Sequence, residues 1–189
     1  MTSVKRRVSG RAEALRASRA HRPAHLADGT WRSRVRHRPE PGGGGGGRTE
    51  PAPRVLLVDD EGAIRTIVRV NLESDGMTVV EAADGREALE RVRQQQPELV
   101  LLDVMMPDVD GWQFAEQLVE DPATRDLPVV FISARASRED RLRAQELGAV
   151  GYVTKPFDPL GLGARVRDIL ARIERGEREQ LNRELLEET

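Results

Sequence analysis

Several kinds of chemistry are excluded by residues that this sequence lacks. It has no cysteine, so it offers no disulfide, no thiolate nucleophile and no cysteine-based zinc site. Its three histidines, His21, His25 and His37, all lie in the first forty residues, so a histidine-based triad or metal site is excluded from the rest of the chain. No apolar run approaches the ~20 residues that cross a bilayer, and no hydrophobic segment follows the basic residues 5–7. We therefore predict a cytoplasmic protein without membrane insertion.

Charge is divided unevenly along the chain. Residues 1–50 contain 12 Lys and Arg against 4 Asp and Glu, whereas residues 51–189 contain 18 against 28. Residues 1–53 also have few large apolar side chains and include an unbroken glycine run from Gly42 to Gly47. Such a segment cannot bury enough apolar surface to offset its chain entropy, and a glycine run is typical of a flexible linker. We predict a disordered tail, and electrostatic binding of nucleic acid by its arginines is left open.

From residue 54 the sequence alternates between short apolar runs and segments with apolar residues at helical spacing. The runs are apolar throughout rather than alternating, which is typical of parallel strands covered by helices on both faces. Right-handed crossovers then favour an α/β fold with a doubly wound sheet. The strands are predicted within residues 54–60, 77–82, 98–103, 127–133 and 150–154. The helices are predicted to begin near Ile64, Asp84, Asp110, Ser137 and Asp158, and the first, second and fourth to stop before Gly76, Pro97 and Gly148.

The predicted strands end in polar residues that this fold brings to one edge of the sheet. Asp59 and Asp60 follow the first strand, Asp103 ends the third, Ser133 ends the fourth, and Lys155 follows the fifth. Two carboxylates ~4 Å apart repel by about 4 kcal/mol at an effective dielectric near 20. Either their pKa values rise or a cation lies among them. Because the candidate ligands are all oxygens, Mg²⁺ is the favoured ion.

Lysine usage is an independent observation. Residues 51–189 contain 17 arginines and a single lysine, Lys155, and a compact ammonium suits a point contact with a carboxylate or phosphate oxygen. Taken singly, the polar residues have ordinary explanations, since aspartate often caps helices and a serine hydroxyl is often structural. Trp112 and Phe157 are expected to pack, and Tyr152 to be half-buried. It is the joint occurrence at four strand ends that indicates a site.

The segments "LVDDE", "LLDVMMPDVDGW", "VVFISA" and "GYVTKPF" together resemble the receiver domain of bacterial two-component response regulators. The resemblance covers residues 54–175, leaving residues 1–53 as the tail and 176–189 as a charged helical extension. It implies a flavodoxin-like (βα)5 fold with strand order 2-1-3-4-5. It also implies a phosphoacceptor that modifies and demodifies itself, not an enzyme that turns over an external substrate.

The resemblance implies a role for each matching acidic residue. Asp103 would be the phosphoacceptor, receiving a phosphoryl group from a sensor histidine kinase or a phosphotransfer protein. Asp59, Asp60, Asp103 and the backbone carbonyl of Met105 would hold Mg²⁺. Lys155 would neutralise charge on the phosphoryl oxygens.

The remaining matching residues are implied to transmit the signal. Ser133 would hydrogen-bond the bound phosphoryl group, and Tyr152 would then turn inward. This movement would alter the face made by the fourth helix, the fifth strand and the fifth helix, where partners bind. The Lys155–Pro156 peptide bond is expected to be cis.

The residues after Ile173 are charged, with Leu181, Leu185 and Leu186 at loosely helical spacing. They either continue the fifth helix or form a short coiled segment. Because they are too few for a helix-turn-helix output domain, we expect signalling through an unidentified protein target. Direct DNA binding is not expected, and a phosphorylation-dependent homodimer is left open.

Two other classes of function remain to be weighed. A Mg²⁺-dependent phosphatase of the haloacid-dehalogenase type also uses an aspartate at a strand end, but it requires a second aspartate where this chain has Met105. A nucleic-acid-binding adaptor would instead depend on the arginines of residues 1–53. Hydrolysis of a phosphomonoester and salt-sensitive binding to nucleic acid separate these alternatives from a receiver.

Overall fold

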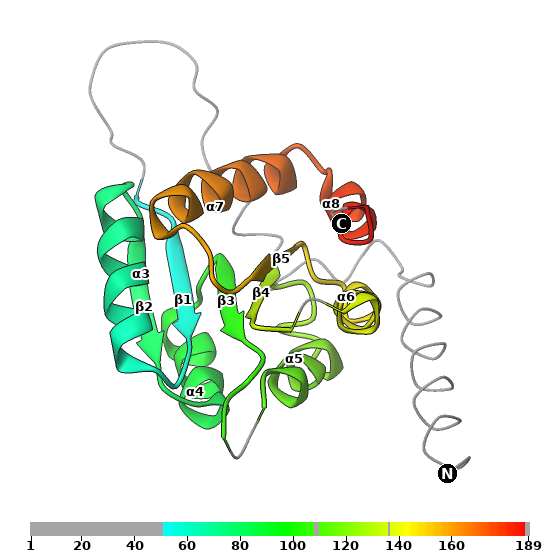
Figure 1. Ribbon diagram of the computed structural model, residues 1–189, viewed down its shortest axis with the longest axis horizontal. Coiled ribbons are helices and arrows are strands. Elements are labelled where there is room, and N and C mark those ends of the chain that lie inside the picture. The colour runs from blue at the N-terminus through cyan, green and yellow to red at the C-terminus, as the bar shows by residue number, and fades with distance from the viewer. Residues whose placement is uncertain (1–50, 108–109, 136, 188–189) are drawn as a thin grey trace.

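The computed structural model describes residues 51–107, 110–135 and 137–187, so the predicted tail lies almost entirely outside the described residues. Five parallel strands form one sheet in the order β2-β1-β3-β4-β5 (Figure 1). The strands are β1 (Arg54–Val58), β2 (Thr78–Ala82), β3 (Leu99–Asp103), β4 (Val129–Ser133) and β5 (Gly151–Thr154). Both the predicted fold class and the predicted strand order are confirmed.

Helices connect the strands and continue beyond the last one. They are α3 (Gly62–Ser74), α4 (Gly85–Gln95), α5 (Gly111–Glu120), α6 (Arg138–Glu146), α7 (Pro159–Glu174) and α8 (Arg178–Glu184). Within the described part of the chain, no helix is both long and apolar enough to cross a membrane.

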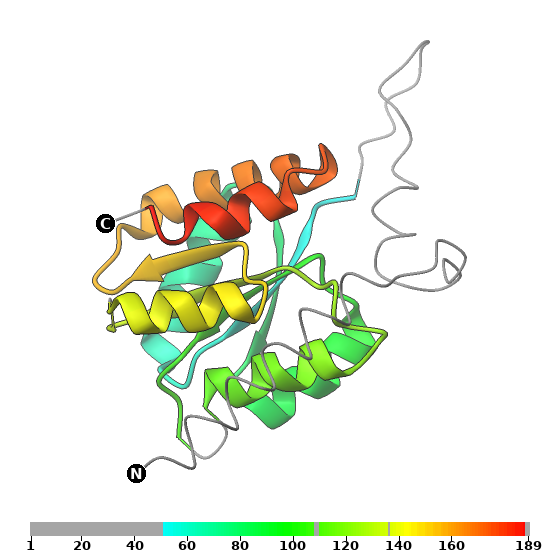
Figure 2. The ribbon, with the colours of Figure 1, turned by 90° about the vertical axis from the view of Figure 1, so that its right-hand side faces the viewer.

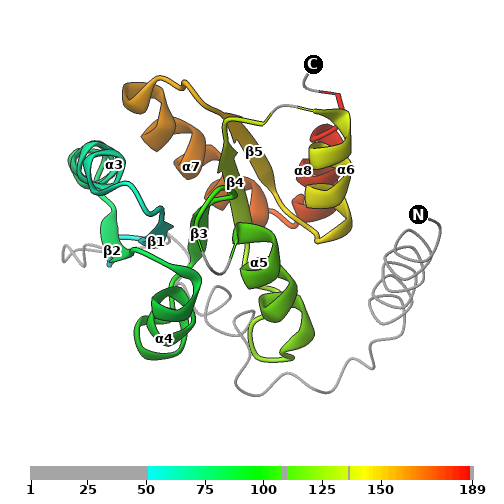
Figure 3. The same cartoon turned by 60° about the horizontal axis from the view of Figure 1, so that its bottom comes forward.

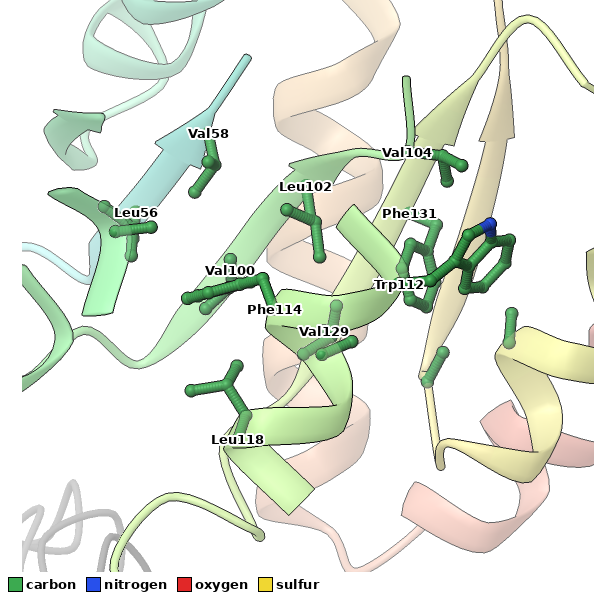
Figure 4. Packing of buried hydrophobic residues seen from close by; sticks show 14 of the residues in the cluster. Leu56, Val58, Val100, Leu102, Val104, Trp112, Phe114, Leu118, Val129 and Phe131 are labelled. Atoms are coloured by element: carbon green, nitrogen blue, oxygen red, sulfur yellow. The ribbon is translucent and has the colours of Figure 1, made fainter. Parts of the chain in front are cut away.

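Helices cover both faces of the sheet, which explains why the strands are apolar at every position (Figure 3). Alternate strand residues such as Leu57 and Leu101 pack with α3 and α7 in one buried cluster. The residues between them, such as Leu102 and Phe131, pack with α4, α5 and α6 in the other cluster, where Trp112 lies 4.5 Å from Phe131 between ring centroids (Figure 4). The sheet is therefore fixed from both sides, and its edge at the strand ends is held in place.

Four of the five predicted helix starts are confirmed by side-chain caps, and α3, the remaining helix, has none. Asp84, Asp110 and Ser137 each accept a hydrogen bond from the backbone N–H three residues later. Asp158 caps α7 through the N–H of Leu160, with a proline in the first turn. These caps fix where the loops between the strand ends and the helices stop, and so limit how far the polar residues in those loops can move.

The residues after α7 do not continue that helix. Gly176 adopts a φ of +84°, a conformation that glycine tolerates best, and the chain reverses there. The separate helix α8 then runs back beside β5, between α7 and α6 (Figure 2). Leu181 and Leu185 are buried, so these two leucines join the core although the rest of the segment is exposed or partly exposed.

Candidate functional site

The ends of β1 and β3, which are neighbours in the sheet, bring three aspartates together. One carboxylate oxygen from each of Asp59, Asp60 and Asp103 lies within 4.8 Å of the others. Asp59 and Asp103 are buried, whereas Asp60 is exposed. The predicted convergence of the three acids is therefore present.

Lys155 joins this cluster from the end of β5. Its Nζ donates to Oδ2 of Asp103 at 2.6 Å and to Oδ2 of Asp59 at 2.9 Å. Its backbone N–H donates to the carbonyl of Ser133 at 2.8 Å, which ties the lysine to the end of β4. The Lys155–Pro156 peptide bond is cis, as predicted. The only lysine of residues 51–189 is thus placed on two of the three carboxylates.

Burial and charge act in opposite directions on these groups. Burial raises the pKa of Asp59 by more than the hydrogen bonds from Lys155 and from the N–H of Glu61 lower it. Burial also disfavours the charged form of Lys155, but its hydrogen bonds to Asp103 and Asp59 outweigh that effect, and the pKa of Lys155 lies above its ordinary value. The cluster still has three carboxylates against one ammonium, so it can accept further positive charge.

The backbone around Asp103 keeps one of its carboxylate oxygens at the sheet edge. The N–H of Met105 donates to Oδ1 at 2.9 Å. At the capped start of α5, Gly111 lies directly on the backbone of Asp103. A Cβ at position 111 would stand 2.1 Å from the Asp103 carbonyl oxygen. The Asp110–Gly111 turn therefore lets α5 begin immediately beside the strand end.

Ser133 and Tyr152 are connected through the loop that follows β4. Ser133 is fully buried, and its Oγ accepts a hydrogen bond from the N–H of Arg135 at 3.0 Å. The hydroxyl of Tyr152 donates to the Arg135 carbonyl at 2.8 Å. Tyr152 is 1% exposed, so the ring already lies inward and is more buried than the sequence suggested. Burial raises its pKa.

An open pocket of about 350 Å³ is lined by Val104 and Met105, the two residues that follow Asp103. Met105, Pro107, Trp112 and Arg135 are among the residues that line it. Met105 is exposed, whereas Trp112 is buried and packs on Phe131. The sequence assigned Trp112 to packing alone. Its place directly after the turn behind Asp103 was the signal that it also borders the site.

Two contacts at Asp59 were not foreseen. The side chain of Arg65, in α3, donates to the backbone carbonyl of Asp59 at 2.6 Å. The N–H of Glu61 donates to Oδ1 of Asp59 at 2.8 Å. Together with Lys155 these groups fix the position of Asp59, and the helical spacing of α3 gave no sign that Arg65 would turn toward the strand end.

The chain belongs to the response regulator receiver domain family, whose match extends over residues 55–167. Receivers of this family are signalling domains of two-component systems, and phosphoacceptance is general to them. The predicted family is thereby confirmed.

Known proteins show the same likeness. The chain is 44% identical over 122 residues to the phosphate regulon transcriptional regulatory protein PhoB of Escherichia coli, covering 65% of this chain and 53% of PhoB. It is 41% identical over 123 residues to the DNA-binding dual master transcriptional regulator RpaA of Synechocystis, covering 65% and 51%. The structure of the chemotaxis protein CheY4 of Vibrio cholerae matches with a TM-score of 0.59 and 30% identity, covering 62% of this chain and 98% of CheY4.

These relatives correct the prediction about partners. The chain spans about half the length of the curated relatives it matches. PhoB and RpaA are transcriptional regulators, and RpaA is described as DNA-binding. The expectation that direct DNA binding plays no part was therefore wrong. It was drawn from the number of residues after the fifth helix, and that number carries no information about what such a receiver controls.

Proposed function

We propose that Asp103 accepts a phosphoryl group from a phosphohistidine of a sensor histidine kinase and that the resulting aspartyl phosphate is the signalling form of the chain. The observation that supports this proposal most strongly is the placement of Asp103 at the sheet edge, with Lys155 on one carboxylate oxygen and two further aspartates beside it. A buried carboxylate that is oriented by a lysine and flanked by two other acids is suited to act as a nucleophile. An ordinary helix cap would need neither the lysine nor the other acids.

The transfer requires only one bond to form and one to break. An oxygen of Asp103 attacks the phosphorus in line, the P–O bond forms, the P–N bond breaks, and the imidazole of the donor leaves with a proton from solvent. Lys155 is within hydrogen-bond distance of Asp103, so its ammonium can stabilise the negative charge on the phosphoryl oxygens during transfer. The N–H of Met105 keeps the carboxylate oriented.

The residues of the cluster fit a bound Mg²⁺. Three carboxylates within 4.8 Å of one another face a single ammonium, and carboxylate and carbonyl oxygens are the ligands that this ion prefers. Asp59, Asp60, Asp103 and the backbone carbonyl of Met105 would hold it. When bound, Mg²⁺ supplies positive charge that offsets repulsion between the carboxylates and the incoming phosphoryl group.

Ser133 and Tyr152 are proposed to pass the state of Asp103 to the face made by α6, β5 and α7. The Ser133 hydroxyl has its oxygen bonded by the N–H of Arg135, and Tyr152 bonds the carbonyl of the same residue. A phosphoryl oxygen that accepts a hydrogen bond from the Ser133 hydroxyl would pull on this loop from one side, while Tyr152 holds it from the other. The face that partners use would then change with phosphorylation.

The proposal also includes the bounds of the receiver domain and the cellular location of the protein. We assign the receiver to residues 54–175, the extension to 176–189 and the tail to 1–53, and we place the protein in the cytoplasm. The chain is proposed to turn over no external substrate. The names of PhoB and RpaA support transcription as the process under control.

The test is incubation of the whole chain with acetyl phosphate and Mg²⁺, followed by intact mass measurement. One added phosphoryl group is expected, and it should be absent from Asp103→Asn and from a sample whose Mg²⁺ is chelated. An unmodified wild-type chain, or equal modification of Asp103→Asn, would overturn the proposal. Steady hydrolysis of a phosphomonoester would favour the phosphatase alternative.

A further inference from the structure

Helix α8 lies along the free edge of the sheet. β5 is the last strand in the order, so one of its sides has no neighbouring strand among the described residues. α8 runs beside that side in the same direction as β5, back toward the end of the sheet that carries Asp103 (Figure 2). An uncovered edge strand is open to pairing with other chains, and a helix laid along it removes that exposure.

The leucines of this segment anchor it on both faces of the sheet. Leu181 is 5% exposed and joins the buried cluster that contains α3 and α7. Leu185 is 2% exposed and joins the opposite cluster, which contains Tyr152 and Ala144 of α6. The segment therefore connects the two buried clusters around the edge of the sheet, so a change in the packing of either cluster would affect it.

Polar contacts join α8 to α6 and to the loop before β5. The Nδ2 of Asn182 donates to the carbonyls of Gln145 and Ala149 at 3.0 and 2.8 Å, and Nε2 of Gln145 donates back to the Asn182 carbonyl at 3.2 Å. Two hydrogen bonds of 2.7 Å join the guanidinium of Arg172, in α7, to the carboxylate of Glu184. These contacts occupy part of the α6, β5 and α7 face in the chain's own structure.

A continuous set of contacts runs from α8 to the phosphoacceptor site. Nη1 of Arg141 donates to the Leu185 carbonyl at 3.5 Å, and its guanidinium lies 5.1 Å from the centre of the Tyr152 ring. The Tyr152 hydroxyl bonds the Arg135 carbonyl, and the Arg135 N–H bonds Ser133. Three residues, Arg141, Tyr152 and Arg135, thus connect Leu185 to Ser133 at the end of β4, the strand that pairs with the one ending in Asp103.

We propose that α8 is an internal ligand of the α6, β5 and α7 face, that it is released when Asp103 is phosphorylated, and that a partner binding this face displaces it. The inference rests on the function proposed above. The inference makes α8, which lies outside the family match at residues 55–167, a regulatory element. When Ser133 turns to a phosphoryl oxygen, the Arg135 loop shifts, Tyr152 and Arg141 lose their present positions, and the Leu185 end of the segment loses its contacts.

The helix has the properties of an element that can be released. It has seven residues and no side-chain cap at its start, and an isolated helix of that length is unstable in water. Its order therefore depends on its contacts with the rest of the chain. By linkage, whatever weakens docking of α8 also favours phosphorylation, by the same factor.

Hydrogen exchange of the whole chain tests this directly. Amides of residues 178–187 should exchange at least ~5-fold faster when acetyl phosphate and Mg²⁺ are present, while amides of β1 and β3 should be unchanged. Asp103→Asn should show no such increase. Intact mass on the same samples records whether the phosphoryl group is present.

The outcomes separate the two proposals. A phosphorylated chain whose α8 amides exchange at the original rate, or more slowly, overturns the internal-ligand proposal and leaves the phosphoacceptor proposal standing. A chain that is never phosphorylated overturns both.

A pair of variants tests the linkage from the other side. Leu185→Ala removes an anchor of the segment and should raise the rate of modification by acetyl phosphate at least ~5-fold, the lower end of the usual coupling between sites. Glu179→Ala changes an exposed residue of the same helix and should leave the rate unchanged. Equal rates for Leu185→Ala and the wild type, with circular dichroism showing that both are folded, would contradict the proposal.

Discussion

Two groups of ion pairs in this molecule differ in burial and in balance. At the sheet edge, Lys155 faces Asp59 and Asp103, both buried, with Asp60 beside them. Between α7 and α8, by contrast, the arginines at 172 and 175 face the glutamates at 177 and 184, all of them partly or fully exposed. The first group has more acids than bases, whereas the second is matched.

The difference separates a reactive site from a structural contact. Exposed, balanced pairs contribute little to stability and are screened by salt. A buried group with excess negative charge is costly to assemble, and that cost is tolerable where a cation or a phosphoryl group is to be bound. Both groups have short contacts, so distance alone would not distinguish them.

Removing a base from each group should affect the reaction differently. Lys155→Ala deletes the ammonium on Asp103, and the rate of modification by acetyl phosphate should fall by about 10²-fold. Arg172→Ala deletes one of the two bases of the group between α7 and α8 and should not slow the reaction. Intact mass against time measures both. A Lys155→Ala chain that reacts at the wild-type rate would remove the distinction.

Mg²⁺ should stabilise the folded chain only through the acidic group at the sheet edge. At about 100 times its dissociation constant, a ligand that binds only the folded chain raises the free energy of unfolding by about 2.7 kcal/mol. Urea titrations with and without Mg²⁺ should show this increase for the wild type and for Glu184→Gln, but not for Asp60→Asn. An equal increase in Asp60→Asn would place the ion elsewhere.

The apolar anchors of α8 should matter more than its ion pairs. Leu181→Ala should lower the free energy of unfolding by about 2 kcal/mol, at the low end for a buried leucine because the helix can detach rather than keep a cavity. Urea unfolding measures the change, with Glu179→Ala as the exposed control, expected within about 0.5 kcal/mol of the wild type. A smaller change for Leu181→Ala than for Glu179→Ala would show that α8 is not packed as described.

The smallest effect expected is that of pH on the exposed group. Hydrogen bonds from Arg172 and Gln180 lower the pKa of Glu184 to about 2, below its ordinary value of 4.5. The unfolded chain therefore binds the proton more readily, so this contribution is present above pH 4.5 and is lost as the pH falls toward about 2. The difference in thermal midpoint between the wild type and Glu184→Gln should shrink between pH 5 and 3, and high salt should reduce it further. A difference that grows toward low pH would contradict the assignment.

Most of the fold could be predicted because its signals are local. Runs of apolar residues gave the strands, and Asp84, Asp110 and Ser137 gave the helix starts, since capping depends only on neighbouring residues. The order of the strands came from the resemblance to a family. The cluster at the sheet edge followed because parallel strands carry their last residues to one place.

What could not be predicted depends on contacts between distant residues. The charged sequence around Leu181 and Leu185 looks exposed, and only the folded sheet shows that each leucine enters a different core. Arg141 gave no sign that it would lie over Tyr152, nor did Tyr152 reveal that it would be buried. Such contacts are set by packing, which leaves no periodic mark in the sequence.

The contact between Gly111 and the carbonyl of Asp103 restricts which sequences can make this site. A side chain at position 111 would have to pass through the backbone oxygen, so a library randomised there should return glycine alone among folded members. Met105, which is 51% exposed at the mouth of the same site, has no such restriction. Variation of this site is therefore expected to be tolerated at Met105 and not at Gly111.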